Sequence, residues 1–465
     1  MTFPKDHNLT TMQRVLQDPD LLLLIFDTFL HEESNHKGES LAIAACVNHT
    51  WFAVATSVLW GQPSYPFHED ITRILTSIPQ SRRQHYASRM RILKINERRA
   101  ASMHTSFKGV NFPLVKNLEL ALTCEIHDQQ AGSIALYLQP ALETLTVHDE
   151  GDYLNDDFVA HVTRNCPHLK AVLFASPGTH LSVQVLSDLF AASKNLEEVS
   201  LRFNDFGRLI SMNPLLQLSK LQKLRIMQLI SPPASSVIFS FVNLYNSHPF
   251  QALRNLTLYA DTSTVSTAAR LFSNVQELSL SVHGADSSFL RNVASMKNLT
   301  TLVVQITGEL PFAVDDMLAL TSLQHLESLV FSSDSHLHPT SFTPSEFDYF
   351  CSSLPSIHHL DLEACLVSCP MEFLVSLSYN CPKLDYLNLY NAACNLETLV
   401  KVDGPLFPNL KTLILNAVQP EVVTEELAIM IGGAIHWHAD SLEHLNLGDS
   451  RFANFVEEVW EDARG

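Results

Sequence analysis

One arrangement of hydrophobic positions recurs through most of the chain: an apolar residue, two others, a second apolar residue, one other, and a third apolar residue. The first clear copy is Met90-Leu93-Ile95, and copies follow about every 27 residues, although Leu114-Leu118-Leu120 fits only loosely, one residue out of register. The remaining copies are Leu142-Leu145-Val147, Leu169-Val172-Phe174, Leu196-Val199-Leu201, Leu221-Leu224-Ile226, Leu253-Leu256-Leu258, Val275-Leu278-Leu280, Leu299-Leu302-Val304, Leu326-Leu329-Phe331, Ile357-Leu360-Leu362, Leu384-Leu387-Leu389, Leu410-Leu413-Leu415 and Leu442-Leu445-Leu447. Because side chains alternate between the faces of a strand, each copy predicts a short strand whose second and third apolar residues point into a core.

The segments between these strands often have helical spacing. Thr343-Pro344-Ser345-Glu346 predicts a helix start with a capping box, and Phe347 and Phe350 continue an apolar helical face. A strand and a helix repeated about every 27 residues are typical of leucine-rich repeats. We therefore predict an α/β leucine-rich-repeat solenoid over residues 90–465, including a C-terminal cap, with parallel strands on its concave face and helices on its convex face.

Residues 12–60 lack the repeated pattern and predict a small all-α domain. Asp18 suits a helix N-cap and Pro19 the first helical position. The following apolar face is wide and consists of Leu21, Leu22, Ile25, Phe26 and Phe29. Three short helices bury little surface alone, so a partner is expected to cover part of it. Residues 61–89 are expected to form a junction and the N-terminal cap of the array.

Composition narrows the function classes. The formal net charge of −19 argues against a nucleic-acid or anionic-membrane binder, because such proteins carry excess Lys and Arg. No apolar run approaches the length that spans a bilayer, and no export signal opens the sequence. We therefore expect a cytoplasmic or nuclear protein whose eight cysteines are thiols.

The residues suggest no catalytic chemistry. Cys365 and Cys369, with Cys351 and Cys381 nearby, could be considered zinc ligands, but their positions in the repeats already account for them. There is no Gly-x-Ser-x-Gly nucleophile motif, P-loop or Gly-rich dinucleotide loop. We expect no metal, no cofactor and no enzymatic activity.

Two resemblances add to this reading. Asn165-Cys166-Pro167-His168-Leu169 and Asn380-Cys381-Pro382-Lys383-Leu384 are similar to the lead-in of ribonuclease-inhibitor-like repeats found in F-box proteins, and Asn204 and Cys365 match the Asn/Cys position of such repeats. The N-terminal segment resembles a fungal-style F-box, and the matching residues are Pro19-Asp20-Leu21-Leu22, Ile25-Phe26, Cys46-Val47, Trp51 and Leu59-Trp60. Asp18-Pro19 stands where the family has Leu-Pro, and the loop over 31–40 is long.

The F-box resemblance implies a substrate-recognition subunit of an SCF-type, cullin-based ubiquitin ligase. It implies that the N-terminal helices dock the Skp adaptor while the repeats bind an unidentified protein target. The adaptor-binding residues would be Pro19, Leu22, Ile25, Trp51 and Trp60. One alternative is a non-catalytic scaffold or inhibitor whose helices only cap the repeats, with Trp51 and Trp60 as ordinary core residues. A second alternative, an enzyme or an activator of a small GTPase, has no residues in its favour.

The target site is expected at outward-facing strand positions on the concave face. These positions are Ser200 and Arg202, Arg225 and Met227, Thr257 and Tyr259, and later Asp361, Glu363, Asn388 and Tyr390. Arg, Tyr and Met are enriched in protein interfaces. The simpler interpretation is that these positions hold a chance mixture of exposed residues. The sharper hypothesis is that Arg202, Arg225, Met227 and Tyr259 bind an acidic or phosphorylated segment of the target.

Overall fold

The computed structural model describes residues 16–31, 37–61, 71–96, 107–122, 134–150, 153–176, 181–203, 212–229, 249–283, 287–308, 313–333, 341–363, 365–366, 368–418, 424–448 and 450–464. The chain divides into two compact units, residues 1–205 and 206–465, which are described separately below. None of the described helices is long and apolar enough to cross a bilayer.

The first unit begins with three helices, α2 (Pro19–His31), α3 (Lys37–Ala44) and α4 (His49–Gly61). As predicted, α2 starts at Pro19, and the Asp18 carboxylate accepts hydrogen bonds from the backbone N–H groups of Asp20 and Leu21 at 2.9 and 3.3 Å. The core of these helices is small. Its buried residues are Leu22, Phe26, Leu41, Val54, Ala55 and Val58.

Two further helices, α5 (Ile71–Ser77) and α6 (Gln80–Ala87), lead into the repeats of the first unit. Five strands then pair in parallel and in chain order: β1 (Ile92–Asn96), β2 (Asn117–Leu122), β3 (Thr144–Asp149), β4 (Ala171–Ser176) and β5 (Glu198–Phe203). The segments between them include η2 (Ala135–Tyr137), α9 (Asp156–Asn165) and α10 (Val183–Ala192). The copy Met90-Leu93-Ile95 lies at the first of these strands, and its three residues are buried.

The second unit continues the same alternation of strand and helix. Its strands are β6 (Ile226–Leu229), β7 (Asn255–Asp261), β8 (Glu277–His283), β9 (Thr301–Thr307), β10 (Ser328–Ser333), β11 (His359–Asp361), β12 (Ser368–Cys369), β13 (Tyr386–Cys394), β14 (Thr412–Ala417) and β15 (His444–Asn446). Its helices are α11 (Met212–Ser219), α13 (Thr262–Leu271), α14 (Phe289–Val293), α15 (Val314–Ala319), η4 (Leu320–Ser322), α16 (Pro344–Ser352), α17 (Met371–Asn380), η5 (Leu396–Lys401), α18 (Glu425–His438) and α19 (Arg451–Arg464). All strands pair in parallel, and β12 is an extra strand that pairs only with the end of β13.

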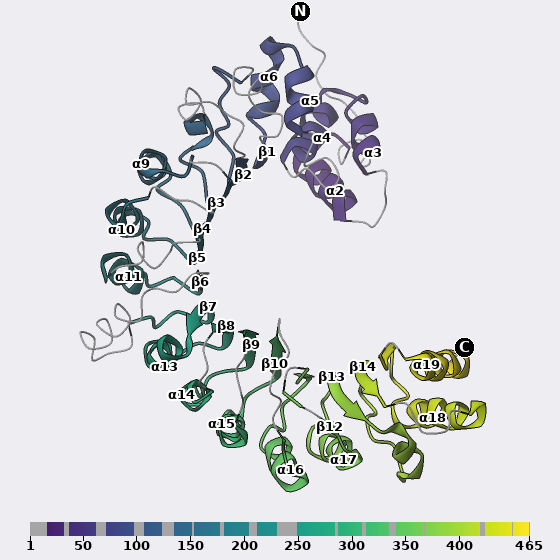
Figure 1. Cartoon of the computed structure of the whole chain (residues 1–465). Helices are drawn as coiled ribbons and strands as arrows, with labels where there is room; N and C mark the ends of the chain where they lie inside the picture. The colour runs from purple at the N-terminus through teal and green to yellow at the C-terminus, as the bar shows by residue number, and fades with distance from the viewer. Residues whose placement is uncertain are drawn as a thin grey trace, which may run out of the picture. The chain divides into compact units, whose positions relative to one another are not determined.

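Within each unit the helices that alternate with the strands lie on one side of them and leave the other side uncovered (Figure 1). We call this helix-free side of the strands the open face. The predicted α/β leucine-rich-repeat solenoid is thus confirmed in both units. The capping box at Thr343 is also confirmed, with Glu346 N–H donating to Thr343 Oγ1 and Thr343 N–H donating to Glu346 Oε2.

The strand registers correct two copies of the pattern. Leu114 is 49% exposed, whereas Val115 is fully buried, so the regular copy is Val115-Leu118-Leu120. Met227 and Leu229 point inward and pair with Leu256 and Leu258 of β7, so the copy in β6 is Leu224-Met227-Leu229. The prediction that Ile226 points inward and Met227 outward is therefore wrong.

The last two helices close the second unit. α18 and α19 pack against each other, and Gly432 of α18 lies where this packing is tightest. A Cβ atom at residue 432 would lie 2.8 Å from Val459 Cγ1, closer than carbon atoms approach. A close helix–helix contact therefore explains the glycine at position 432.

Candidate protein-binding surfaces

The N-terminal helices expose a large apolar surface. On α2 four residues at helical spacing are more than a third exposed, and we call them the apolar stripe: Leu21, Leu24, Ile25 and Phe29. Leu24 is the most exposed of them, at 65%. Ile43 and Val47 add further exposed apolar area, at 71% and 57%. So much exposed apolar surface on so small a group of helices is typical of an interaction site.

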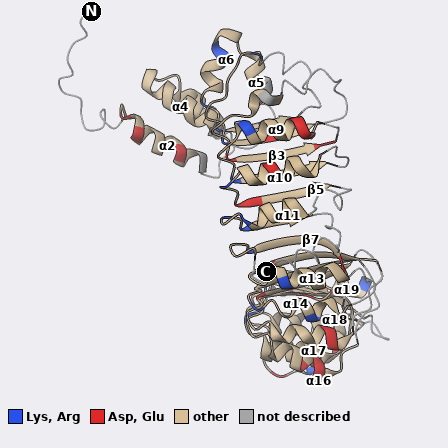
Figure 2. Cartoon of the chain, turned by 90° about the vertical axis from the view of Figure 1, so that its left-hand side faces the viewer, with Lys and Arg blue, Asp and Glu red and all other residues tan. Residues whose placement is uncertain are grey.

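A cleft of about 300 Å³ lies beside the stripe. Its lining residues are Asp20, Leu23, Leu24, Asp27, Ser57, Val58, Gly61 and Arg91, which come from α2, α4 and the start of β1. In Figure 2 the acidic positions of α2 stand out on a helix that is otherwise uncharged. The cleft therefore combines an apolar wall with charged groups at its edge.

The predicted adaptor-binding residues fall into two groups. Pro19 and Ile25 are exposed and available to a partner. Leu22 is fully buried in the helical core, so its prediction as a direct contact is wrong. Sequence reasoning assigned no contact to Leu24 or Phe29, although residues 21, 24, 25 and 29 have helical spacing.

The two tryptophans both have partners inside the first unit. Trp51 is half-buried; its indole N–H donates to the Leu16 carbonyl at 2.7 Å, and its ring meets the Phe26 ring edge-on at 5.3 Å. Trp60, also half-buried, packs on Tyr86 of α6 with ring centroids 5.0 Å apart. Both side chains therefore stabilise the helices themselves, and any contact with a partner uses only their remaining exposed parts.

The predicted target-binding residues are not gathered into one site. Arg202 is exposed on β5 of the first unit, and the other three belong to the second unit. Arg225 is exposed but precedes β6, and Met227 is fully buried, which excludes it as a contact. Tyr259 is half-buried on the open face and stacks on His283, with ring centroids 5.5 Å apart.

A denser group occurs on the open face of the second unit, where β11 meets β13. We call it the β11/β13 cluster, and it comprises His359, Asp361, Glu363, Tyr386 and Asn388. His359 and Tyr386 are register partners, and their rings stack in parallel at 4.0 Å. Asp361 and Asn388 are also register partners, and Asn388 Nδ2 donates to Asp361 Oδ2 at 3.0 Å.

Burial changes the titration of this cluster. It raises the pKa of Asp361, and burial together with the Asp361 charge raises the pKa of Glu363. Burial lowers the pKa of His359, against the opposing influence of Asp361 and Asp385. Burial also raises the pKa of the Tyr386 hydroxyl, with further contributions from the Asp361 and Glu363 charges.

The described cysteines are structural. None of them is in a disulfide, and all except Cys46 are buried. Burial raises the pKa of Cys166 to about 12, which makes its thiol unreactive at neutral pH. Among the described residues, no group of three or more His, Cys, Asp or Glu side chains is placed to hold a metal ion. Asn204, the other residue matched to the repeat's Asn/Cys position, lies outside the described residues.

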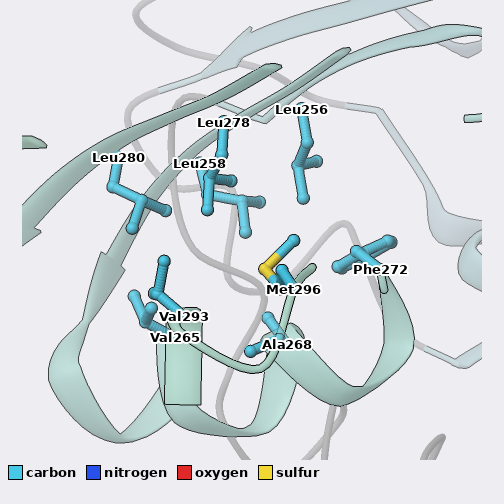
Figure 3. Close-up of a pocket in the computed structure, with 10 residues that line it drawn as sticks. Leu256, Leu258, Val265, Ala268, Phe272, Leu278, Leu280, Val293 and Met296 are labelled. Carbon is cyan, nitrogen blue, oxygen red and sulfur yellow. The ribbon is translucent and has the colours of Figure 1, made fainter. Parts of the chain in front are cut away.

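One gap inside the core of the repeats is too small to hold a ligand. Figure 3 shows that gap between β7, β8 and the helices behind them, lined by Leu256, Leu258, Phe272, Leu278 and Met296 among others. Its volume is about 10 Å³, roughly that of one water molecule, and its lining is apolar. It is a packing defect of the core.

Comparisons with known proteins show similarity at the level of solved structures. No protein-family model matches the chain, and no curated protein sequence matches it. An internalin, InlF, from Listeria monocytogenes is 15% identical with a TM-score of 0.42, over 86% of this chain and 95% of that chain. The complex of Rad7 and Elc1 from yeast gives 13% identity and a TM-score of 0.42, over 96% of this chain and 95% of that chain. PEPR1–AtPEP1 gives 12% identity and a TM-score of 0.36, over 80% and 49% of the two chains.

Proposed function

We propose that this chain is a non-catalytic substrate receptor of an SCF-type ubiquitin ligase, acting in the cytoplasm or nucleus. The N-terminal helices dock the Skp adaptor, and the repeats hold a protein target near the transferred ubiquitin. The observation that carries the proposal is the apolar stripe on α2, because a helix that exposes Leu24 and Phe29 at 65% and 48% calls for a partner. The resemblance of residues 12–60 to an F-box supplies the identity of that partner.

The stripe and the core of the helices have separate roles in this proposal. Leu22 and Phe26 hold α2 against α4, while Leu21, Leu24, Ile25 and Phe29 are exposed and do not belong to that core. Removing exposed stripe residues should therefore abolish docking without unfolding the helices. Deleting the helices would be a poorer test, because Trp60 packs on Tyr86 and a deletion would uncover α6.

Co-expression with the Skp adaptor tests the proposal. The parent chain is expected to co-purify with the adaptor and to recruit the cullin. The double variant Leu24→Asp, Phe29→Asp is expected to lose the adaptor, because central interface residues each contribute at least about 2 kcal/mol. A matched control places Asp at Ile429 and Met430 of α18, which are 50% and 54% exposed, and should retain the adaptor. Retention by the stripe variant, or no adaptor on the parent chain, would reject the proposal.

The alternative is a scaffold or inhibitor whose helices only cap the repeats. The contacts of Trp51 and Trp60 within the first unit favour this alternative, because both rings are used to hold the helices together and to α6. It predicts a chain that is monodisperse without an adaptor and gains nothing from one. It also leaves the exposed apolar stripe without a function, and for that reason we prefer the substrate-receptor proposal.

A further inference from the structure

The open face of the second unit carries charge of one sign. Over the described strands β6 to β15 no strand residue is Lys or Arg, whereas Asp261, Glu277 and Asp361 are strand residues. The first unit differs, since its strands include Lys94 and Arg202, and Lys94 forms an ion pair with Glu119 at 2.6 Å. Arg225 and Arg254 are close in sequence to β6 and β7, but each lies just before its strand and not within it. The predicted affinity of this face for an acidic segment therefore has no support from its strand residues.

On this face, the β11/β13 cluster is where the surrounding side chains would bind a cation most favourably. The register places Ser328, His359, Tyr386 and Thr412 in one row across four strands. The next row on the same face is Val330, Asp361, Asn388 and Ile414. The two rows are two residues apart along each strand, or about 6.6 Å, so the aromatic pair of one row lies within reach of the carboxylate of the other.

Asp361 is held in place before any ligand arrives. Its side chain accepts hydrogen bonds from Asn388 Nδ2 at 3.0 Å and from the Glu363 backbone N–H at 3.1 Å. The residue is only 9% exposed, yet no Lys or Arg among the described residues forms an ion pair with Asp361 or Glu363. A buried carboxylate without a cation is costly, and a cationic ligand would relieve that cost.

The strands around the cluster depart from the regular repeat. β13 pairs with β11 through its first residues and with the extra strand β12 through its last. Its pairing with β14 shifts register between Leu389 and Ala393. Such bulges re-aim side chains and are over-represented beside functional sites.

We propose that the β11/β13 cluster binds a lysine or arginine side chain in a basic segment of a protein partner. The cation lies against the stacked rings of His359 and Tyr386 and forms charge-assisted hydrogen bonds with Asp361 and Glu363. This inference rests on the proposed function only in taking the repeats as the target-binding part. It replaces the acidic target of the sequence hypothesis with a basic one.

Fluorescence anisotropy with the full chain tests this proposal at physiological salt. The probes are labelled peptides of about a dozen residues in which Gly and Ser alternate with Arg, Lys or Glu. The parent chain is expected to bind the Arg and Lys peptides and not the Glu peptide. The variant Asp361→Asn, Glu363→Gln is expected to bind at least about tenfold more weakly, and Tyr386→Leu severalfold more weakly because the cation loses its aromatic face.

Controls separate this site from the general attraction of an acidic protein. Glu425→Gln, Glu426→Gln removes the same two charges from the exposed start of α18 and should change affinity less than twofold. If Asp361→Asn alters the melting curve, Glu363→Gln and Tyr386→Leu alone carry the test. Equal weakening by both double variants, or no binding of either cationic peptide by the parent chain, would overturn the proposal. No adaptor is present in this assay, so its outcome is independent of whether the helices dock one.

Discussion

The N-terminal helices leave many of their apolar side chains exposed, whereas the repeats bury theirs. In the repeats the three apolar positions of each described copy are buried, and Leu256 is 2% exposed. On α2, by contrast, Leu24 is 65% exposed and four other apolar residues are more than a third exposed. A repeat covers its apolar face with the next repeat, whereas three short helices have no such neighbour for their outer side. The same residue type therefore contributes to stability in one region and, in the function proposed above, to binding in the other.

The largest difference in stability is expected between two variants that each change one leucine to aspartate, one in the repeats and one in α2. Leu256→Asp places a charge in the apolar core of the second unit and should destabilise it by at least about 4 kcal/mol. Leu24→Asp changes an exposed residue and should cost about 1 kcal/mol or less. Thermal melts of the two variants measure the contrast. Similar melting temperatures would mean that Leu256 does not face the core.

A smaller effect is expected from Leu22→Ala, which tests the boundary between core and stripe within α2. Leu22 is fully buried, so the cavity left by truncation should destabilise the helices by about 2 to 4 kcal/mol. Ile25→Ala, three residues on and 38% exposed, should cost well under half as much. Hydrogen exchange of the α2 amides in each variant provides the measurement. Equal exchange in both would contradict the assignment of Leu22 to the core.

Thr343→Ala should cost about 1 kcal/mol, because it removes half of the capping box of α16. Hydrogen bonds from Thr343 hold the pKa of Glu346 below its ordinary value of 4.5. A lowered folded-state pKa stabilises the protein above the unfolded value, and this stabilisation is lost as the pH falls through the lowered value. The difference in stability between parent and variant should therefore shrink below about pH 4.5. Urea melts at neutral and acid pH test this, and a difference that grows in acid would contradict it.

The smallest effect should come from Glu143→Gln in the first unit. Lys116 and Lys170 each place an ammonium group 2.6 Å from the Glu143 carboxylate and lower its pKa to about 2. The contribution is present above about pH 4.5 and is lost as the pH falls toward 2. Because these charges are exposed, Tm should fall by only about 1 °C, and 1 M NaCl should remove the difference. A salt-independent change would indicate a packing role for Glu143.

The alternation of apolar residues was enough to predict the strands, because the buried face of a strand needs an apolar residue at every second position. It failed at β6, where Leu221, Leu224, Ile226, Met227 and Leu229 fit two registers. The copy at Leu224 lies 28 residues after Leu196 and 29 before Leu253, so an even repeat length was the signal that favours the correct register.

The candidate sites were less predictable than the fold. A helical wheel places Leu24 far from Leu22 but Phe29 close to it, so the wheel alone does not say which of these residues face α4. The burial of Asp361 and Asn388 depends on pairing between strands 27 residues apart, which alternation within one strand does not contain. The sequence therefore pointed to the regions of both candidate surfaces, but it counted the buried residues Leu22 and Met227 among the contacts.

Hydrogen–deuterium exchange of the full chain, with and without the Skp adaptor, tests the central contrast most directly. The account predicts that the adaptor slows exchange in α2, and in α3 and α4 beside it, while α18 and the repeat strands stay unchanged. Leu24→Asp, Phe29→Asp should abolish that protection, and Ile429→Asp, Met430→Asp should preserve it. Unchanged exchange in α2 at saturating adaptor, or protection confined to the repeats, would contradict the assignment of the apolar stripe as the docking surface.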